Sequence, residues 1–338
     1  MSFITYSQNF EDLMLWRALK DVKKGFYIDV GANNPVQDSV TKAFYDKNWH
    51  GINIEPEYRF YRALKRDRIR DINLNCAVSS TCKEIPLYVS KLRGWSTTSI
   101  EVSKQQQKND LLEEVIKVEA KTLDEIINTY QKDIKEIHFL KIDVEGAEKD
   151  VLESFSFSPY RPWIIIVEST SPGTNEDVSD VWESLLIEKD YSKVYFDGVN
   201  KYYLAKEKES LKDAFSYPPN VIDDWIHINH KHALEKAQRL EAQLKQTQLE
   251  KEKENTILKE ENTFLLESID LLKKEREGLY ASRSWKITKP LRVIMSLFKK
   301  ENQQQKDSVS KKDLQKKEPN NIELSQNAYK IYKDLTCE

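Results

Sequence analysis

Short apolar runs alternate with helical patterns over the first 206 residues. The runs predict strands at 26–30, 51–55, 72–78, 85–89, 115–118, 138–143 and 163–168, and helices are expected over 11–20, 39–47, 58–66, 123–130, 145–155 and 178–189. The run at 163–168 is continuously apolar, which is typical of a central parallel strand covered on both faces. Asp197-Gly198, between strands at 194–196 and 202–205, predicts a hairpin. We therefore expect an α/β domain over 1–206, with a mostly parallel sheet of about seven strands and helices on both faces.

The pattern changes to a seven-residue repeat over 233–280. Leucines recur at one position of the repeat from Leu258 to Leu279. These positions form a seam, the face that would contact a second helix. In the first half of the segment, several seam positions are polar or charged. Asn255 and Asn262 favour a two-stranded coiled coil, because paired Asn side chains satisfy each other across the seam. We expect this segment to form a homodimer, a lone solvated helix being the alternative, and we expect 207–232 to be a connector.

Charge is distributed unevenly along the 338 residues, although the formal net charge is only −3. This balance lacks the large basic excess of a nucleic-acid-binding domain, so no nucleic-acid partner is expected. Residues 281–300 carry six basic and no acidic side chains. They predict a basic amphipathic segment at an anionic membrane surface, with packing on the coiled coil or on a partner protein as alternatives. Residues 301–338 are polar and predict a mostly disordered tail.

No apolar run is long enough to span a membrane, and no signal peptide is visible. The three cysteines form neither a disulfide framework nor a zinc spacing, which indicates free thiols in a reducing compartment. These features favour a cytoplasmic protein.

Candidate chemistry follows the strands, where α/β sheets bind their ligands. Gly31 follows the first strand and permits a tight turn, and Asp29 places a carboxylate beside it. The absence of further glycines disfavours a dinucleotide or P-loop site and suits a ligand with a positive centre and no phosphates. Glu55 ends the next strand and can accept hydrogen bonds from a ribose diol, unless it is a surface carboxylate. Asp143 and Glu145 follow the strand at 138–143 and can both face the cleft, unless Glu145 only favours the positive end of a helix.

These motifs resemble the FkbM family of S-adenosylmethionine-dependent methyltransferases. The resemblance covers about residues 5–205, with six motifs in order at 7–12, 26–35, 51–57, 94–99, 121–124 and 139–152. It implies a class I methyltransferase-like (Rossmann-like) sheet and methyl transfer to a hydroxyl oxygen. It also implies a cofactor site in which Glu55 holds the ribose, the methionine part lies beside Asp29, Gly31, Ala32 and Asn33, and adenine lies by Asn75 and Cys76.

A hydroxyl acceptor needs a base or a metal ion to take its proton during attack. Asp143 is the first candidate for the base and Glu145 the second, and either can instead bind a divalent ion such as magnesium with water. Polar residues before the first strand can fold over the cofactor as a lid. A loop before the strand at 138–143 contains Trp95, which can stack on a sugar ring. Trp95 can equally be a buried side chain that fills the edge of the sheet. These acceptor-side candidates are Gln8, Glu11, Trp95 and Ser96.

Residues 284–292 resemble a short segment near the ends of bacterial surface-polysaccharide enzymes. This resemblance implies an enzyme held near the inner membrane, among polysaccharide-assembly enzymes, that methylates a sugar hydroxyl of an O-antigen or capsule glycan. The alternative is a coiled-coil scaffold whose methyltransferase-like domain has lost catalysis and binds partners.

Overall fold

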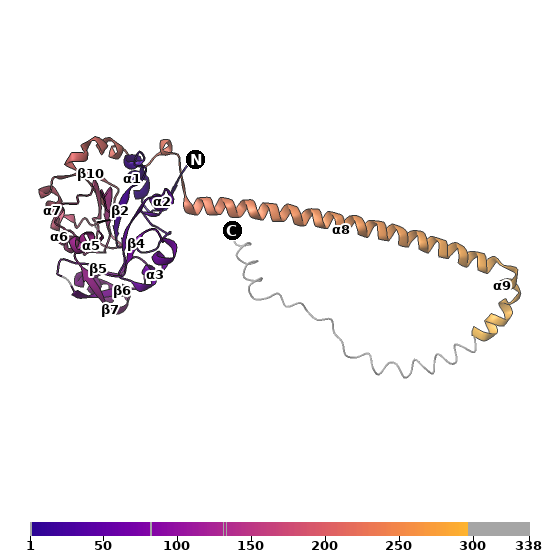
Figure 1. Ribbon diagram of the computed structural model, residues 1–338. Coiled ribbons are helices and arrows are strands. Elements are labelled where there is room, and N and C mark those ends of the chain that lie inside the picture. Colours follow the sequence, from indigo (N-terminus) through magenta and orange to yellow (C-terminus); the bar gives the residue numbers. More distant parts are fainter. Residues whose placement is uncertain (1, 82, 131, 133, 297–338) are drawn as a thin grey trace. The chain divides into compact units, whose positions relative to one another are not determined.

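The computed structural model describes residues 2–81, 83–130, 132 and 134–296 (Figure 1). The chain divides after Leu240 into an N-terminal and a C-terminal unit. The segment predicted to be a disordered tail, 301–338, and the last four residues of the predicted basic segment lie outside the described residues.

A seven-stranded sheet in the order β10-β11-β9-β8-β2-β3-β4 forms the centre of the N-terminal unit. Its strands are β2 (Phe26–Val30), β3 (His50–Ile54), β4 (Ile72–Leu74), β8 (Phe139–Ile142), β9 (Ile164–Glu168), β10 (Tyr191–Phe196) and β11 (Asn200–Ala205). Strands β4, β3, β2, β8 and β9 run parallel, whereas β11 is antiparallel to both β9 and β10. The predicted α/β class with seven strands and an antiparallel terminal hairpin is confirmed, and the sheet is mixed. This architecture is consistent with a methyltransferase-like fold.

Helices cover both faces of this sheet, because alternate residues of each strand enter opposite cores. In β2, Ile28 and Val30 pack towards α5 (Leu123–Tyr130), α6 (Glu148–Glu153) and α7 (Glu183–Glu188). Tyr27, on the other face, packs towards α1 (Glu11–Leu19) and α2 (Lys42–Asp46). A 3-10 helix at Ser179–Val181 precedes α7, and α3 (Tyr58–Asp67) connects β3 to β4.

A second sheet of three strands is built from β5 (Ala77–Val78), β6 (Lys83–Ser90) and β7 (Leu112–Lys121). The prediction of one strand over 72–78 is therefore wrong, since its first half is β4 and its second half pairs with β7. Between the halves, the Asn75 amide donates hydrogen bonds to the carbonyl oxygens of Glu55 and Pro56, each 2.9 Å long. Helix α4 (Ile100–Lys108), which the sequence pattern did not predict, precedes β7.

The segment 207–232, expected to be a connector, packs on the N-terminal unit. It contains β12 (Trp225–His227), which pairs in parallel with β1 (Phe3–Thr5). Two 3-10 helices, Lys206–Phe215 and Val221–Asp223, precede β12. Phe215 is buried in the core that contains α1, and an Arg17 guanidinium nitrogen lies 2.7 Å from a carboxylate oxygen of Asp223.

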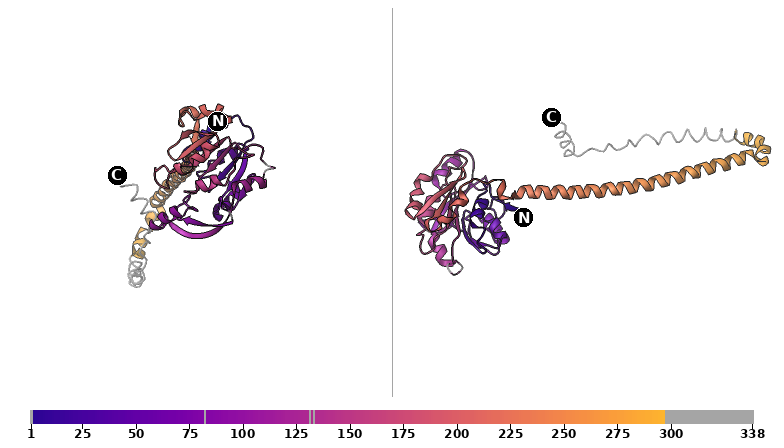
Figure 2. Two further views of the ribbon diagram at one scale, coloured as in Figure 1. Left: turned by 90° about the vertical axis from the view of Figure 1, so that its left-hand side faces the viewer. Right: turned by 90° about the horizontal axis from the view of Figure 1, so that it is seen from above.

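The seven-residue repeat lies in α8 (Ile228–Ala281), a continuous helix of 54 residues (Figure 2). Helix α9 (Arg283–Ile287) and a helical stretch over 289–296 follow it. Leu265 and Leu272, on the predicted seam, are 56% and 63% exposed in the single chain, and their pairing with a second chain stays a prediction. In the described part of the chain, no helix is long and apolar enough to cross a membrane.

Candidate active site

The carboxyl ends of β3, β2, β8 and β9 meet at one edge of the large sheet. The strand register aligns the ends of these strands. The residues at or just beyond these ends, Glu55, Gly31, Asp143 and Glu168, therefore lie side by side. A cavity of about 420 Å³ opens there, and binding sites for small molecules commonly measure about 300–1,000 Å³.

All but one of the residues predicted for the site line this cavity. The exception is Asn75, whose side chain instead holds the backbone after β3, as described above. The predicted residues that line the cavity are Gln8, Glu11, Asp29, Gly31, Ala32, Asn33, Glu55, Cys76, Trp95, Ser96, Asp143 and Glu145.

The turn after β2 depends on the absence of a side chain at Gly31. Its φ is +79°, and a Cβ atom here would lie only 1.9 Å from the carbonyl oxygen of Asp143. The backbone N–H of Gly31 donates a 3.0 Å hydrogen bond to the carbonyl oxygen of Ile54. The turn is thus packed between the ends of β3 and β8, which brings its backbone to the cavity wall.

Two buried groups, Asp29 and Lys141, lie beneath this turn. Asp29 Oδ2 accepts a 3.1 Å hydrogen bond from the Thr41 hydroxyl, and Asp29 Oδ1 lies 3.4 Å from Lys141 Nζ. Lys141 Nζ also donates to the Gly31 carbonyl oxygen at 2.9 Å and lies 3.2 Å from Asp143 Oδ2. Burial lowers the pKa of Lys141, but the carboxylates of Asp143 and Asp29 raise it by more, to above its ordinary value. Lys141 is therefore a fixed positive charge between Asp29, Asp143 and the Gly31 carbonyl oxygen.

Glu55 is 5% exposed, and backbone donors hold its side chain. One carboxylate oxygen accepts a 2.8 Å hydrogen bond from the N–H of Asn33, and the other accepts a 2.7 Å bond from the N–H of Glu57. Burial raises the pKa of Glu55 to about 8, against the opposing hydrogen bond from Asn33. Each oxygen has a second lone pair, so Glu55 can still accept hydrogen bonds from a ligand in the cavity.

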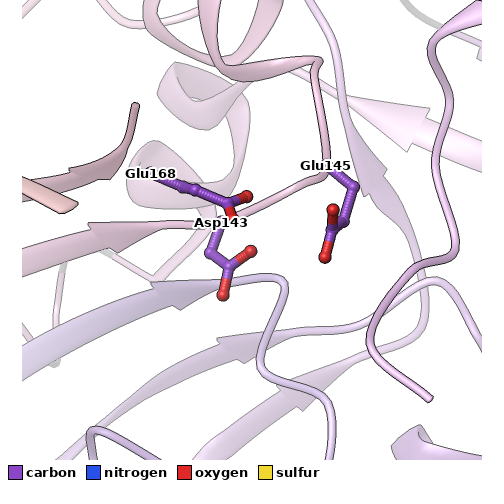
Figure 3. Close-up of side chains that lie close together, drawn as sticks. All are labelled: Asp143, Glu145 and Glu168. Atoms are coloured by element: carbon purple, nitrogen blue, oxygen red, sulfur yellow. The ribbon is translucent and has the colours of Figure 1, made fainter. Parts of the chain in front are cut away.

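Three carboxyl groups gather beside the turn: Asp143 and Glu145 come from the segment after β8, and Glu168 ends β9 (Figure 3). We call these residues the acidic trio. One carboxylate oxygen from each lies within 4.8 Å of the others. Burial, followed by the charges of Asp143 and Glu148, raises the pKa of Glu145 to about 9. Burial and the charges of Asp143 and Glu145 raise the pKa of Glu168 well above its ordinary value.

The backbone at Glu145 corrects the prediction that a helix begins there. Glu145 and Gly146 have φ values of +55° and +95°, and α6 starts only at Glu148. The Thr97 hydroxyl donates a 2.7 Å hydrogen bond to the carbonyl oxygen of Glu145. A left-handed turn held by this bond, rather than a first helical turn, directs Glu145 towards the cavity.

Residues 29–195 match the family model of the methyltransferase FkbM domain. The comparison with curated proteins gives no match. The matched segment, 29–195, which we call the FkbM domain after that model, includes the turn at Gly31, Glu55 and the whole acidic trio, whereas Gln8 and Glu11 precede it.

The loop of the FkbM domain before α4 closes one side of the cavity. The Ser96 hydroxyl donates a 3.1 Å hydrogen bond to Glu57, and Trp95 packs on Gly173, where an added Cβ atom would lie 2.6 Å from the indole ring. Trp95 is half-buried at the cavity wall. An indole in this position can present its remaining surface to a bound molecule.

The rim on another side is formed by residues before the FkbM domain. Glu11 is 7% exposed and accepts hydrogen bonds from the N–H of Asn9 at 2.9 Å and from the Asn200 amide at 3.1 Å. Burial and the nearby charge of Asp197 raise the pKa of Glu11 to about 7. Movement of this rim as a lid stays a prediction.

Sequence reasoning assigned no role to Lys141 or Glu168. The sequence nevertheless pointed to both residues. Lys141 lies two positions before Asp143, so the two side chains are expected on the same face of the strand. Glu168 ends the most apolar strand, just as Asp143 follows the end of the strand before it. The sequence could not show that β8 and β9 are neighbours in register.

Proposed function

We propose that the protein is an S-adenosylmethionine-dependent O-methyltransferase. The observation that carries the proposal is the glycine turn of β2 with Glu55 beside it, at one cavity inside the matched FkbM domain. A methyl donor of the S-adenosylmethionine type follows from the family, and its sulfonium suits a cavity with several carboxyl groups and a single-glycine turn.

The residues around the cavity fit the parts of this cofactor. Asp29, Gly31, Ala32 and Asn33 would bind the methionine part, and the free lone pairs of Glu55 would accept hydrogen bonds from the ribose. Cys76 lies with Ala77, Val78 and Leu87 on an apolar wall suited to adenine. Burial raises the pKa of the Cys76 thiol to about 11, so it stays neutral in this wall.

The bound cofactor supplies an electrophilic methyl group. In transfer, the methyl carbon would exchange its bond to sulfur for a bond to the acceptor oxygen, the electron pair of the broken bond would stay on sulfur, and a carboxylate of the chain would take the hydroxyl proton. Asp143 is the better base, because its side chain is 37% exposed at the cavity and Lys141 Nζ holds its Oδ2 at 3.2 Å, which leaves Oδ1 available to a hydroxyl. Glu145, with a pKa raised to about 9 by burial and neighbouring charge, holds its own proton at neutral pH.

The acceptor in this proposal is a sugar hydroxyl of a bacterial surface glycan, an O-antigen or capsule chain. Trp95 and Ser96 at the cavity provide a stacking surface and a hydroxyl for a sugar. The basic segment 281–300 would hold a cytoplasmic homodimer, joined through 233–280, at the inner membrane near polysaccharide-assembly enzymes.

Calorimetric titration of the full chain with S-adenosylmethionine tests the cofactor site. We expect one molecule bound per chain, and Glu55→Gln should weaken binding at least tenfold (about 1.4 kcal/mol), because the amide replaces one acceptor oxygen by a donor that faces a backbone N–H. Glu148→Gln is the matched control, since Glu148 is also buried and accepts two backbone hydrogen bonds but does not line the cavity. No binding by the full chain would favour the non-catalytic scaffold, and transfer of labelled methyl groups to isolated glycan would support the acceptor.

A further inference from the structure

The acidic trio has too little positive charge around it. Lys141 is the one ammonium group that lies within 4 Å of a trio carboxylate in the described part of the chain, and it contacts Asp143 through Oδ2 while also pairing with Asp29. Glu145 and Glu168 have no ion pair among the described residues. The three carboxyl groups therefore share one ammonium group as their counter-charge among the described residues.

Two members of the trio also lack hydrogen-bond donors. Glu145 is only 9% exposed, and no hydrogen bond reaches its carboxylate within the described residues. Glu168 Oε2 is fully buried and has no hydrogen-bond partner there, and the side-chain hydrogen bond of the Glu168 carboxyl group is to another member of the trio, Asp143. A buried carboxyl group without a partner is unfavourable in either protonation state, and such groups are normally hydrogen-bonded, paired with a charge or bound to a metal ion.

Three other buried acids near the cavity, Glu55, Glu148 and Glu11, differ in this respect, whereas Asp29 Oδ1 and Glu57 Oε1 lack a hydrogen-bond partner but lie in ion pairs with Lys141 and Arg59. Glu55 and Glu148 each accept two hydrogen bonds from backbone N–H groups, and Glu11 accepts one from a backbone N–H and one from an amide side chain. The chain therefore provides hydrogen-bond donors to the carboxyl groups of Glu55, Glu148 and Glu11. The missing donors at Glu145 and Glu168 indicate a ligand that the protein chain does not itself provide.

We propose that Asp143, Glu145 and Glu168 bind one divalent cation, Mg²⁺ or Mn²⁺, at the acceptor side of the cavity. The inference deepens the proposed methyl transfer and rests on it for the cation's role, although binding can be measured separately. A ligand set of oxygens only suits these hard cations rather than zinc.

The geometry of the trio fits such an ion. Magnesium holds its ligands at about 2.1 Å, so two ligand oxygens lie about 3–4.2 Å apart. The trio's oxygens, within 4.8 Å of one another, need only small side-chain rotations to reach that spacing. Asp143 can offer Oδ1, because Lys141 contacts Oδ2. Water and the acceptor hydroxyl would complete the coordination.

In methyl transfer, the cation would place the acceptor oxygen and polarise its O–H bond. The released proton would pass to a carboxylate oxygen of the trio that does not contact the cation. The cation would thus act together with Asp143, the proposed base, and Glu168 would be needed next to Asp143 as a ligand of the cation.

The test is a titration of the full chain with Mn²⁺, followed by the electron paramagnetic resonance signal of the free ion, without cofactor or acceptor. We expect one Mn²⁺ per chain that Mg²⁺ displaces, and affinity weakened at least tenfold in Glu145→Gln and in Glu168→Gln. Both changes replace a buried carboxylate that lacks a donor, so the variants should fold, and thermal unfolding in metal-free buffer checks this.

Glu55→Gln is the matched control, because it removes a carboxylate from the same cavity but leaves the trio intact. It should weaken S-adenosylmethionine binding at least tenfold and keep Mn²⁺ affinity, whereas Glu168→Gln should weaken Mn²⁺ binding and keep S-adenosylmethionine affinity. Absence of Mn²⁺ binding, or Mn²⁺ affinity unchanged in both trio variants, would overturn the cation site. Mn²⁺ binding by a protein that does not bind S-adenosylmethionine would sink the proposed function and leave the cation site standing.

Discussion

Replacing Gly31 by alanine tests whether the cavity wall requires a residue without a side chain. The added Cβ would lie 1.9 Å from the Asp143 carbonyl oxygen. This neighbour is backbone, so it cannot rotate away, and the ends of β2 and β8 would have to separate. The substitution therefore acts on the turn that would hold the cofactor and on the position of Asp143 together.

Two contributions set the expected magnitude for Gly31→Ala. A left-handed backbone conformation costs a residue with a side chain about 1–2 kcal/mol, and overpacking adds about 1–3 kcal/mol. The free energy of unfolding should fall by about 2–5 kcal/mol in urea titrations followed by tryptophan fluorescence. Calorimetry should show S-adenosylmethionine affinity lowered at least tenfold, which corresponds to about 1.4 kcal/mol.

Gly198→Ala separates the two contributions. Gly198 also has a positive φ, +105°, but no atom lies within 4 Å of an added Cβ. This variant should lose only about 1–2 kcal/mol of stability through its backbone conformation, and it should bind the cofactor normally. Equal stability losses in the two variants, with cofactor binding retained in both, would refute the claim that the Asp143 carbonyl restricts the turn.

Two further predictions concern stability and assembly. Burial lowers the pKa of His138 to about 4, against about 6.5 when unfolded. Between these values His138 binds more protons in the unfolded chain, so its own contribution to stability falls as the pH drops through this window. At pH 5 the loss relative to pH 7.5 is about 2 kcal/mol. His138→Asn keeps an acceptor for the Phe26 N–H and should lack this contribution of about 2 kcal/mol, which urea titrations at the two pH values can measure. An equal pH dependence of the unfolding free energy in both proteins would contradict the low pKa of His138. Ending the chain after Leu240 should convert a dimer to a monomer in analytical ultracentrifugation without changing S-adenosylmethionine affinity, whereas a monomeric full chain would count against the coiled coil.

The sequence predicted the large sheet well because each strand carries its own local signal. The run at 163–168 and the runs that end near Gly31 and Asp143 are apolar segments closed by polar residues, and all three became neighbouring strands. Residues at or just after strand ends could thus be assigned to one edge before any contact was known. This reasoning assigned Asp29, Gly31, Glu55, Asp143 and Glu145 to the edge where the cavity lies, and the other predicted residues that line it came from the family resemblance and from the candidate lid and loop.

The errors arose where long-range contacts override the local pattern. The run 72–78 is apolar enough for one strand, but the Asn75 side chain bonds to the segment after β3, and the two halves join different sheets. At Glu145, acidic residues favour the start of a helix, yet the hydrogen bond from Thr97 accompanies a left-handed turn. Neither partner is close in sequence, so no periodicity could reveal them.

The cavity rim is anchored outside the FkbM domain, at the beginning of α8. Asp12 accepts hydrogen bonds from the Thr5 and Ser7 hydroxyls at 2.6 and 2.7 Å, which fixes the chain between β1 and the rim residues 8–11. β1 pairs with β12, and Ile228, the first residue of α8, is buried in a cluster with β1. A change in the first turn of α8 therefore acts on β1 and, through Asp12, on the rim. For this reason a chain ending at residue 206 would lack support for its own cavity, whereas one ending after Leu240 retains it.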